Sequence, residues 1–181
     1  MFSAATQLSL QQNYLTQVEG GICIDYKCFG LEQVTTAGQH VLPSLDLVLN
    51  LLQSNEDWVV GLHRTPNFYG LFDKQYISTD HFVAINNESP LQHLSAFMQQ
   101  VQLDNVWMND IAVETAMRYV AKSLPALAAP ATQSYFFTPS FTSHRHTTTS
   151  SLLPYVYGFD YFYCLLAVQA TQVVVLNVFF D

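Results

Sequence analysis

The chain has 181 residues, of which half are hydrophobic and only 11% are charged, and its net charge is −8 at pH 7. This composition excludes an intrinsically disordered chain, which combines low hydrophobicity with high charge, and the length fits one domain or one domain with an extension. Six lysine and arginine residues stand against 14 aspartate and glutamate residues, so we expect neither a nucleic acid nor an anionic membrane surface as a partner.

The N-terminal residues and the cysteines predict an intracellular protein of the cytoplasm or nucleus. The first residues form neither the basic nor the apolar stretch of a secretory signal, and no apolar run reaches the roughly 18 residues of a transmembrane helix. Three cysteines, an odd and small number, fit a reducing compartment. Cys23 and Cys28 lack a second pair of zinc ligands, so we expect packed thiols there.

The N-terminal region, residues 1–88, has no assigned function or domain type. Its first forty residues are rich in glutamine and interrupted by glycines, so no element is predicted there. Further along we expect a helix over residues 45–52 capped by Ser44, a short buried strand over 58–63 and another strand over 82–85.

The middle of the chain predicts two helices. Ser89 and Pro90 are typical of the N-cap and the first residue of a helix, and apolar residues then repeat at helical spacing. The second helix begins at Asn109 and Asp110, carries an apolar stripe on one side and ends at Pro125.

The C-terminal part predicts strands. An aromatic segment at residues 135–137 predicts one strand, and the segments 161–168 and 173–180 predict a hairpin. Residues 89–181 are thus predicted to form a helix–helix–strand–hairpin region. The fold class that we expect is α+β, with a mixed or antiparallel sheet and about three helices rather than a βαβ series.

The segment VWMNDI at residues 106–111 resembles the W-L-N-D-x-x-I segment that opens the catalytic domain of the SUMO- and ubiquitin-like-protein-specific cysteine proteases, the sentrin-specific peptidase family. In that family an amphipathic helix, an aromatic strand and a hairpin follow, and the same order is predicted here. The resemblance covers roughly residues 100–181. It implies a papain-like cysteine protease fold without its C-terminal part, with Trp107, Asn109 and Asp110 as scaffold positions.

The catalytic residues of that family are not matched in this chain. Phe162 stands at the position of the general-base histidine, and Asn177 stands at that of the orienting aspartate. The nucleophilic cysteine would come after Asp181, whereas Cys164 lies on the hairpin. Because a phenyl ring accepts no proton, no thiolate–imidazole pair can form at these positions. We therefore name no catalytic residue, and whether the chain is an enzyme stays open.

Other catalytic or metal-binding arrangements have weak support. His144 and His146 could lie on one side of an extended segment, but no third metal ligand is evident, so we expect neither a metal nor a cofactor. Glycine-rich phosphate loops and nucleophile elbows are absent from the sequence. A hydrolase that pairs Cys23 or Cys28 with His63 or His81 rests on the presence of these residues alone.

Two functions are predicted. In the first, the chain is a non-catalytic or truncated relative of the ubiquitin-like-protein-specific proteases that keeps a binding surface for a ubiquitin-like protein. In the alternative, it is a structural or interaction protein without enzymatic activity that self-associates or docks a partner protein through its apolar C-terminal strand. That strand exposes an edge unless something covers it. The cover is supplied by the N-terminal half, supplied by a partner, or missing because the chain is a fragment.

Overall fold

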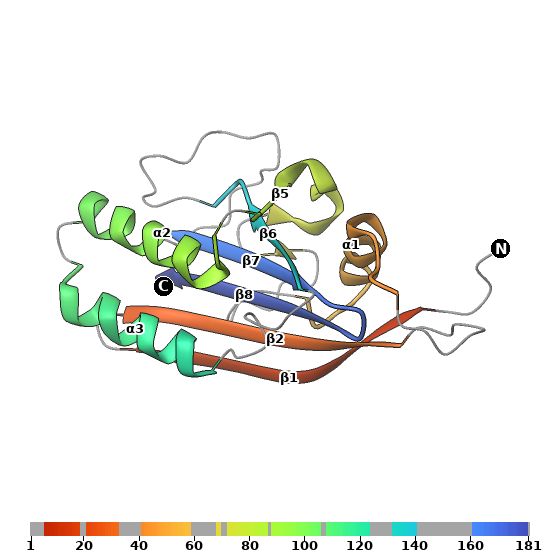
Figure 1. Cartoon of the computed structure of the whole chain (residues 1–181), viewed down its shortest axis with the longest axis horizontal. Helices are drawn as coiled ribbons and strands as arrows, with labels where there is room; N and C mark the ends of the chain where they lie inside the picture. Colours follow the sequence, from red (N-terminus) through yellow and green to blue (C-terminus); the bar gives the residue numbers. More distant parts are fainter. Residues whose placement is uncertain are drawn as a thin grey trace.

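The computed structural model describes residues 6–18, 21–32, 41–58, 68–69, 72–86, 88–105, 108–123, 132–140 and 161–180. Within these ranges the chain forms a six-stranded antiparallel sheet with helices on both faces (Figure 1). Across the sheet the strands are β1 (Gln7–Gln17), β2 (Ile22–Glu32), β8 (Gln172–Phe180), β7 (Phe162–Val168), β6 (Gln133–Phe137) and β5 (Phe82–Ala84). The α-helices are α1 (Leu45–Gln53), α2 (Pro90–Asp104) and α3 (Asp110–Ser123). The predicted α+β class is confirmed.

Smaller elements precede β5 in the chain. They are a two-stranded ladder of β3 (Phe68–Tyr69) and β4 (Phe72–Asp73), and the 3-10 turns η2 (Lys74–Tyr76) and η3 (Thr79–His81). The side chain of Gln53 at the end of α1 donates hydrogen bonds to the carbonyl oxygens of Lys74 and Ile77, at 2.9 and 2.7 Å. These bonds tie the turns to α1.

Alternate side chains of the central strands enter two cores, one on each face of the sheet. The core on the side of α1 contains Phe29, Phe162 and Val175, and we call this side the α1 face. The opposite core contains Tyr163 and Leu176 and is covered by the other two helices, so we call this side the α2/α3 face. Figure 1 shows α1 near one end of the sheet and α2 and α3 near the other.

The three helices begin at the predicted caps. Ser44 Oγ accepts a hydrogen bond from the backbone N–H of Leu47 at 3.3 Å, and Ser89 forms a reciprocal capping box with Gln92. Asn109 Oδ1 accepts the backbone N–H of the third residue of α3 at 2.8 Å. Each cap satisfies a backbone donor that the helix itself leaves without a partner, which is why these short polar residues mark the boundaries.

The first forty residues, for which the sequence predicted no element, contain β1 and β2, which are paired strands of 11 residues each. Nearly all of β2 is buried, so it lacks the polar–apolar alternation of a half-exposed strand. Asp25 and Lys27 also interrupt its apolar run. Gly21, just before β2, has a φ of 80°, which residues with a side chain rarely adopt.

A β-bulge between Leu10 and Gln12 hides β1 from a search for alternation. Leu8 and Leu10 pack against the core of the α1 face, whereas Tyr14 packs against the core of the α2/α3 face. The three residues have even numbers and would share one face of a regular strand. The extra residue in the bulge reverses the alternation, so no single pattern covers the strand.

The predicted C-terminal hairpin is confirmed as β7 and β8, and the predicted strands at residues 82–85 and 135–137 are confirmed as β5 and β6. Of the alternatives left open for the apolar C-terminal strand, the structure shows cover by the N-terminal half. β8 lies inside the sheet and pairs with β2 from Ile22 opposite Phe180 to Gly30 opposite Gln172. The N-terminal half therefore supplies the neighbour that this apolar strand needs.

Several predicted features lie outside the described residues. The strand expected over residues 58–63 is described only at Trp58, which is buried. Trp107 and the segment with His144 and His146 also lie outside the described residues. No helix in the described part of the chain is long and apolar enough to cross a membrane.

Candidate functional site

The three cysteines form no disulfide and are buried, as expected for packed thiols at Cys23 and Cys28. These two lie five positions apart on β2, so they face opposite sides of the sheet and cannot share a metal ion. Cys28 Sγ donates a hydrogen bond to Gln172 Oε1 at 3.5 Å, and burial raises the pKa of this thiol. A raised pKa keeps the thiol protonated, which makes it a poor nucleophile.

The hypothesis of a Cys23–His81 pair is wrong. Cys23 lies on β2, and His81 directly precedes β5, four strand spacings away. Four spacings amount to about 19 Å, far beyond hydrogen-bond distance. His81 Nδ1 instead accepts the backbone N–H of Ser78 at 2.9 Å. His63, the other proposed partner, lies outside the described residues.

The remaining described histidine, His93 on α2, meets no cysteine either. It contacts Tyr163 on the α2/α3 face, whereas the neighbouring Cys164 points to the α1 face. Cys28 shares the face of His93. However, Cys28 pairs with Val174 of β8, whereas Tyr163 pairs with Val178, four positions further along the same strand. Four positions along a strand span about 14 Å. His93 is therefore within reach of neither Cys28 nor Cys164.

The positions that the protease resemblance singles out have structural roles here. Phe162 is fully buried opposite Phe179, and Asn177 lies opposite Cys164. Asp110 begins α3 and accepts a hydrogen bond from the side chain of Gln102. No group of three His, Cys, Asp or Glu side chains that could hold a metal ion occurs in the part of the chain that the structure describes.

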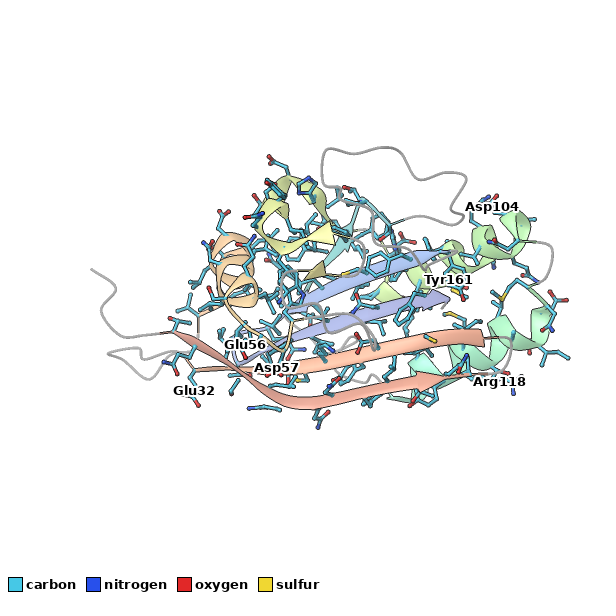
Figure 2. The ribbon with its side chains drawn as sticks, turned by 180° about the vertical axis from the view of Figure 1, so that it is seen from behind. Glu32, Glu56, Asp57, Asp104, Arg118 and Tyr161 are labelled. Carbon is cyan, nitrogen blue, oxygen red and sulfur yellow. The ribbon has the colours of Figure 1, made fainter. Side chains whose placement is uncertain are left out.

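A buried polar cluster crosses β2 and β8 on the α1 face. Lys27 Nζ lies 3.1 Å from Asp25 Oδ1, and the side chains are only 5% and 1% exposed. Asn177 Nδ2 donates to the other carboxylate oxygen of Asp25 at 3.3 Å. Charged residues such as Glu32 and Arg118 lie instead at the periphery of the fold (Figure 2). We assign this cluster to structure rather than to ligand binding, because its charged groups are closed off from solvent.

The candidate functional site is a pocket of about 230 Å³ at the edge of the sheet. Val83 and Ala84 of β5, with Ile85 and Asn86 after it, form one side. Phe136 of β6, Glu88 before α2 and His93 on α2 line the rest. Val83 lies opposite Phe136 in the sheet, so both side chains are on the α2/α3 face beside His93.

Aromatic contacts and one hydrogen bond hold the imidazole of His93 in place. Its ring centroid lies 4.6 Å from that of Phe136, and its Nδ1 lies 3.0 Å from the hydroxyl of Tyr163. Which of the two atoms donates depends on the ring tautomer. Either way, the bond occupies Nδ1, so Nε2 is the ring atom that His93 can offer to a ligand.

Burial also determines the protonation of this pair. It raises the pKa of the Tyr163 phenol, with smaller contributions from Cys164 and Glu88. Burial lowers the pKa of His93, and the carboxylate of Glu88 opposes this shift only in part. Both groups are therefore neutral at pH 7, and Glu88 is the charged residue among those that line the pocket.

We expect His93 to titrate below the ordinary histidine pKa of about 6.5. Between the two pKa values the unfolded chain binds more protons than the folded chain, so stability falls as pH drops through this window. The contribution is fully present above the unfolded pKa and is lost once pH passes below the folded one. Chemical shifts of the ring protons, followed by NMR from pH 8 to pH 4, measure this directly.

The control for this titration is His93→Gln. This variant should lose the part of the pH dependence of the unfolding free energy in urea that the His93 imidazole contributes. A midpoint at or above the ordinary value in the folded protein would contradict burial as the dominant cause of the shift.

The backbone of β5 points some of its hydrogen-bonding groups away from β6, beside the pocket. Ile85 N–H donates to Ser134 O, and Thr138 N–H donates to His81 O, both at 2.8 Å. Alternate residues of an antiparallel strand bond the same neighbour, and here the odd-numbered residues from His81 to Ile85 face β6. Ala84 lies at an intervening position, so its N–H and C=O point away from β6. Ala84 is also exposed. No described strand pairs with this side of β5.

The sequence alone did not identify this pocket. Its residues come from three separate segments of the chain, and His93 is one polar residue within a helical pattern. The available signal was a short apolar segment that contains Val83 and precedes a capped helix, a pattern that is common in proteins. Comparison with protein-family models, with curated proteins and with solved structures finds no match to this chain.

Proposed function

We propose that this chain is a non-catalytic protein-interaction domain that binds an extended polypeptide segment along β5. The observation that carries the proposal is the edge strand with outward-pointing backbone groups at Ala84, directly beside the pocket. Peptides that add a strand to a sheet gain affinity from main-chain hydrogen bonds and specificity from pockets for alternate side chains. Both parts are adjacent here.

Several properties of the site favour docking over catalysis. His93 lies far from Cys28 and on the other face from Cys164, and the described cysteines are buried. The site offers a neutral imidazole, a phenyl ring and a carboxylate around a small pocket. Such groups recognise a side chain, whereas covalent peptide hydrolysis needs an activated nucleophile.

The protease resemblance suggests one class of partner. A fold of the papain-like type that had lost its catalytic residues could keep a surface for a ubiquitin-like protein, whose extended C-terminal tail is suited to strand addition. Three cysteines without a disulfide favour binding in a reducing compartment, the cytoplasm or the nucleus. A second copy of this chain is the other partner that an open edge would accept.

Ala84→Pro tests the proposal, because it removes the outward N–H while the bonds of β5 to β6 remain with its neighbours. The ligands are ubiquitin, SUMO and heptapeptides selected from a phage-displayed library, and binding is measured by ¹⁵N NMR titration. We expect Ala84→Pro to weaken binding at least about tenfold, which corresponds to roughly 1.4 kcal/mol. Ala84→Val keeps the N–H and should bind within about threefold of the parent.

Equal binding by the parent and Ala84→Pro would contradict the proposal, as would chemical-shift changes confined to β1, the opposite edge of the sheet. Light scattering separates the two kinds of partner. A dimer that Ala84→Pro converts to a monomer would assign the edge to a second copy.

A further inference from the structure

We propose that the pocket between β5 and α2 receives a lysine or arginine side chain of the docked segment. This inference rests on the proposed function and adds the identity of one ligand side chain. The aliphatic part of that side chain would lie against Phe136 and Val83, and its cationic end would reach the carboxylate of Glu88.

The charge of the pocket favours a cation. Glu88 is acidic, and the described residues that line the pocket include neither lysine nor arginine. The carboxylate of Glu88 lines the pocket together with His93, and its charge acts on both His93 and Tyr163 electrostatically. The whole chain carries a net charge of −8, so its long-range field also attracts a basic segment.

The size and the apolar surface of the pocket favour a long side chain. A volume of about 230 Å³ is smaller than the roughly 300–1,000 Å³ of sites for drug-sized ligands, so one side chain is a better match than a whole cofactor. Val83 is 56% exposed, and the face of Phe136 can contact methylene groups or a cation.

The neutral state of His93 is compatible with this ligand. A protonated imidazole in the same wall would repel an ammonium or guanidinium group, whereas burial keeps His93 neutral at pH 7. Its bond to Tyr163 holds the ring in one orientation, so the wall is preformed. A preformed pocket loses less conformational entropy when it binds.

The experiment uses three heptapeptides of alternating threonine and valine that differ only at the central residue, which is lysine, norleucine or glutamate. Norleucine keeps the aliphatic part of lysine and lacks its charge. In the parent protein we expect the lysine peptide to bind about five- to tenfold more tightly than the norleucine peptide and the glutamate peptide to bind weakest. Affinities are measured by ¹⁵N NMR titration.

Glu88→Gln should remove the difference between lysine and norleucine and leave the affinity for norleucine unchanged. The matched control is Glu32→Gln, which changes the net charge equally at an exposed residue four strand spacings from β5. It should keep the preference for lysine. The preference should also shrink at about 1 M salt, where the Debye length falls to about 3 Å.

Equal affinities for the lysine and norleucine peptides in the parent would overturn the inference. If both peptides then still lost affinity in Ala84→Pro, strand addition would stand and only the basic side chain would be rejected. If none of the three peptides bound the parent at millimolar concentration, the proposed function would fail as well.

Discussion

Replacing Asp25 with alanine is expected to lower the free energy of unfolding by about 3–5 kcal/mol. The substitution would leave Lys27 Nζ buried with its nearest countercharge removed, and Asn177 would lose the carboxylate oxygen that it donates to. Lys27 Nζ would keep its hydrogen bond to Asn13 Oδ1 at 3.5 Å, but a buried ammonium group without a countercharge is among the least favourable groups in a protein interior. Urea denaturation followed by far-UV circular dichroism measures the change.

The exposed ion pair on α3 provides a matched control. Arg118 and Glu114 approach to 2.8 Å, closer than the buried pair, but their side chains are 78% and 67% exposed. Glu114→Ala should therefore change stability by only about 0.3–0.5 kcal/mol. If Asp25→Ala were no more destabilising than Glu114→Ala, the buried pair would have no special weight.

A double substitution separates loss of the pair from loss of one partner. Asp25→Leu with Lys27→Met replaces both charges by apolar groups of similar size, which in other buried pairs is neutral or stabilising. The double variant should be at least about 2 kcal/mol more stable than Asp25→Ala. A double variant as unstable as the single one would mean that the pair itself, rather than an abandoned charge, stabilises the sheet.

Replacing Phe162 with alanine is expected to lower the free energy of unfolding by about 3–5 kcal/mol. Its ring is fully buried and contacts Phe137 edge-on, with 6.5 Å between the ring centroids and an angle of 90°. Truncation removes that aromatic contact and leaves a cavity between β7 and the elements of the α1 face. The same urea experiment measures the loss.

Two variants calibrate this result. Phe162→Leu keeps most of the volume and should be clearly less destabilising than alanine, and Val83→Ala, at an exposed position, should change stability by less than about 0.5 kcal/mol. Phe162 is the residue that the protease resemblance aligns with the general-base histidine. A small effect of Phe162→Ala would mean that this position is not a packing position, contrary to the burial of its ring.

The sequence predicted the elements whose signals are local. The three helices were found because Ser44, Ser89 and Asn109 cap them and apolar residues repeat behind the caps. The C-terminal hairpin was found from two apolar segments with a short turn between them. In each case the residues that determine the element are neighbours in the chain, so no knowledge of the tertiary fold was needed.

The missed strands depend on distant contacts. β2 can contain Asp25 because Asn177, far along the chain, supplies a hydrogen bond to it. The bulge in β1 cancels the alternation on which strand prediction relies. The candidate pocket is non-local in the same sense, because β6 brings Phe136 next to Val83 and His93 only in the folded sheet.

The pairing of β2 with β8 has a further consequence, which concerns the folding kinetics. It joins residues that are 142 to 158 positions apart in the chain. Pairings of such high sequence separation require closure of a long loop before they bring any gain, and they place a domain among slowly folding proteins. Until this pairing forms, β8 has an unpaired edge rich in valine and phenylalanine. The element that stabilises the finished sheet is therefore also the one most exposed to aggregation while the chain folds.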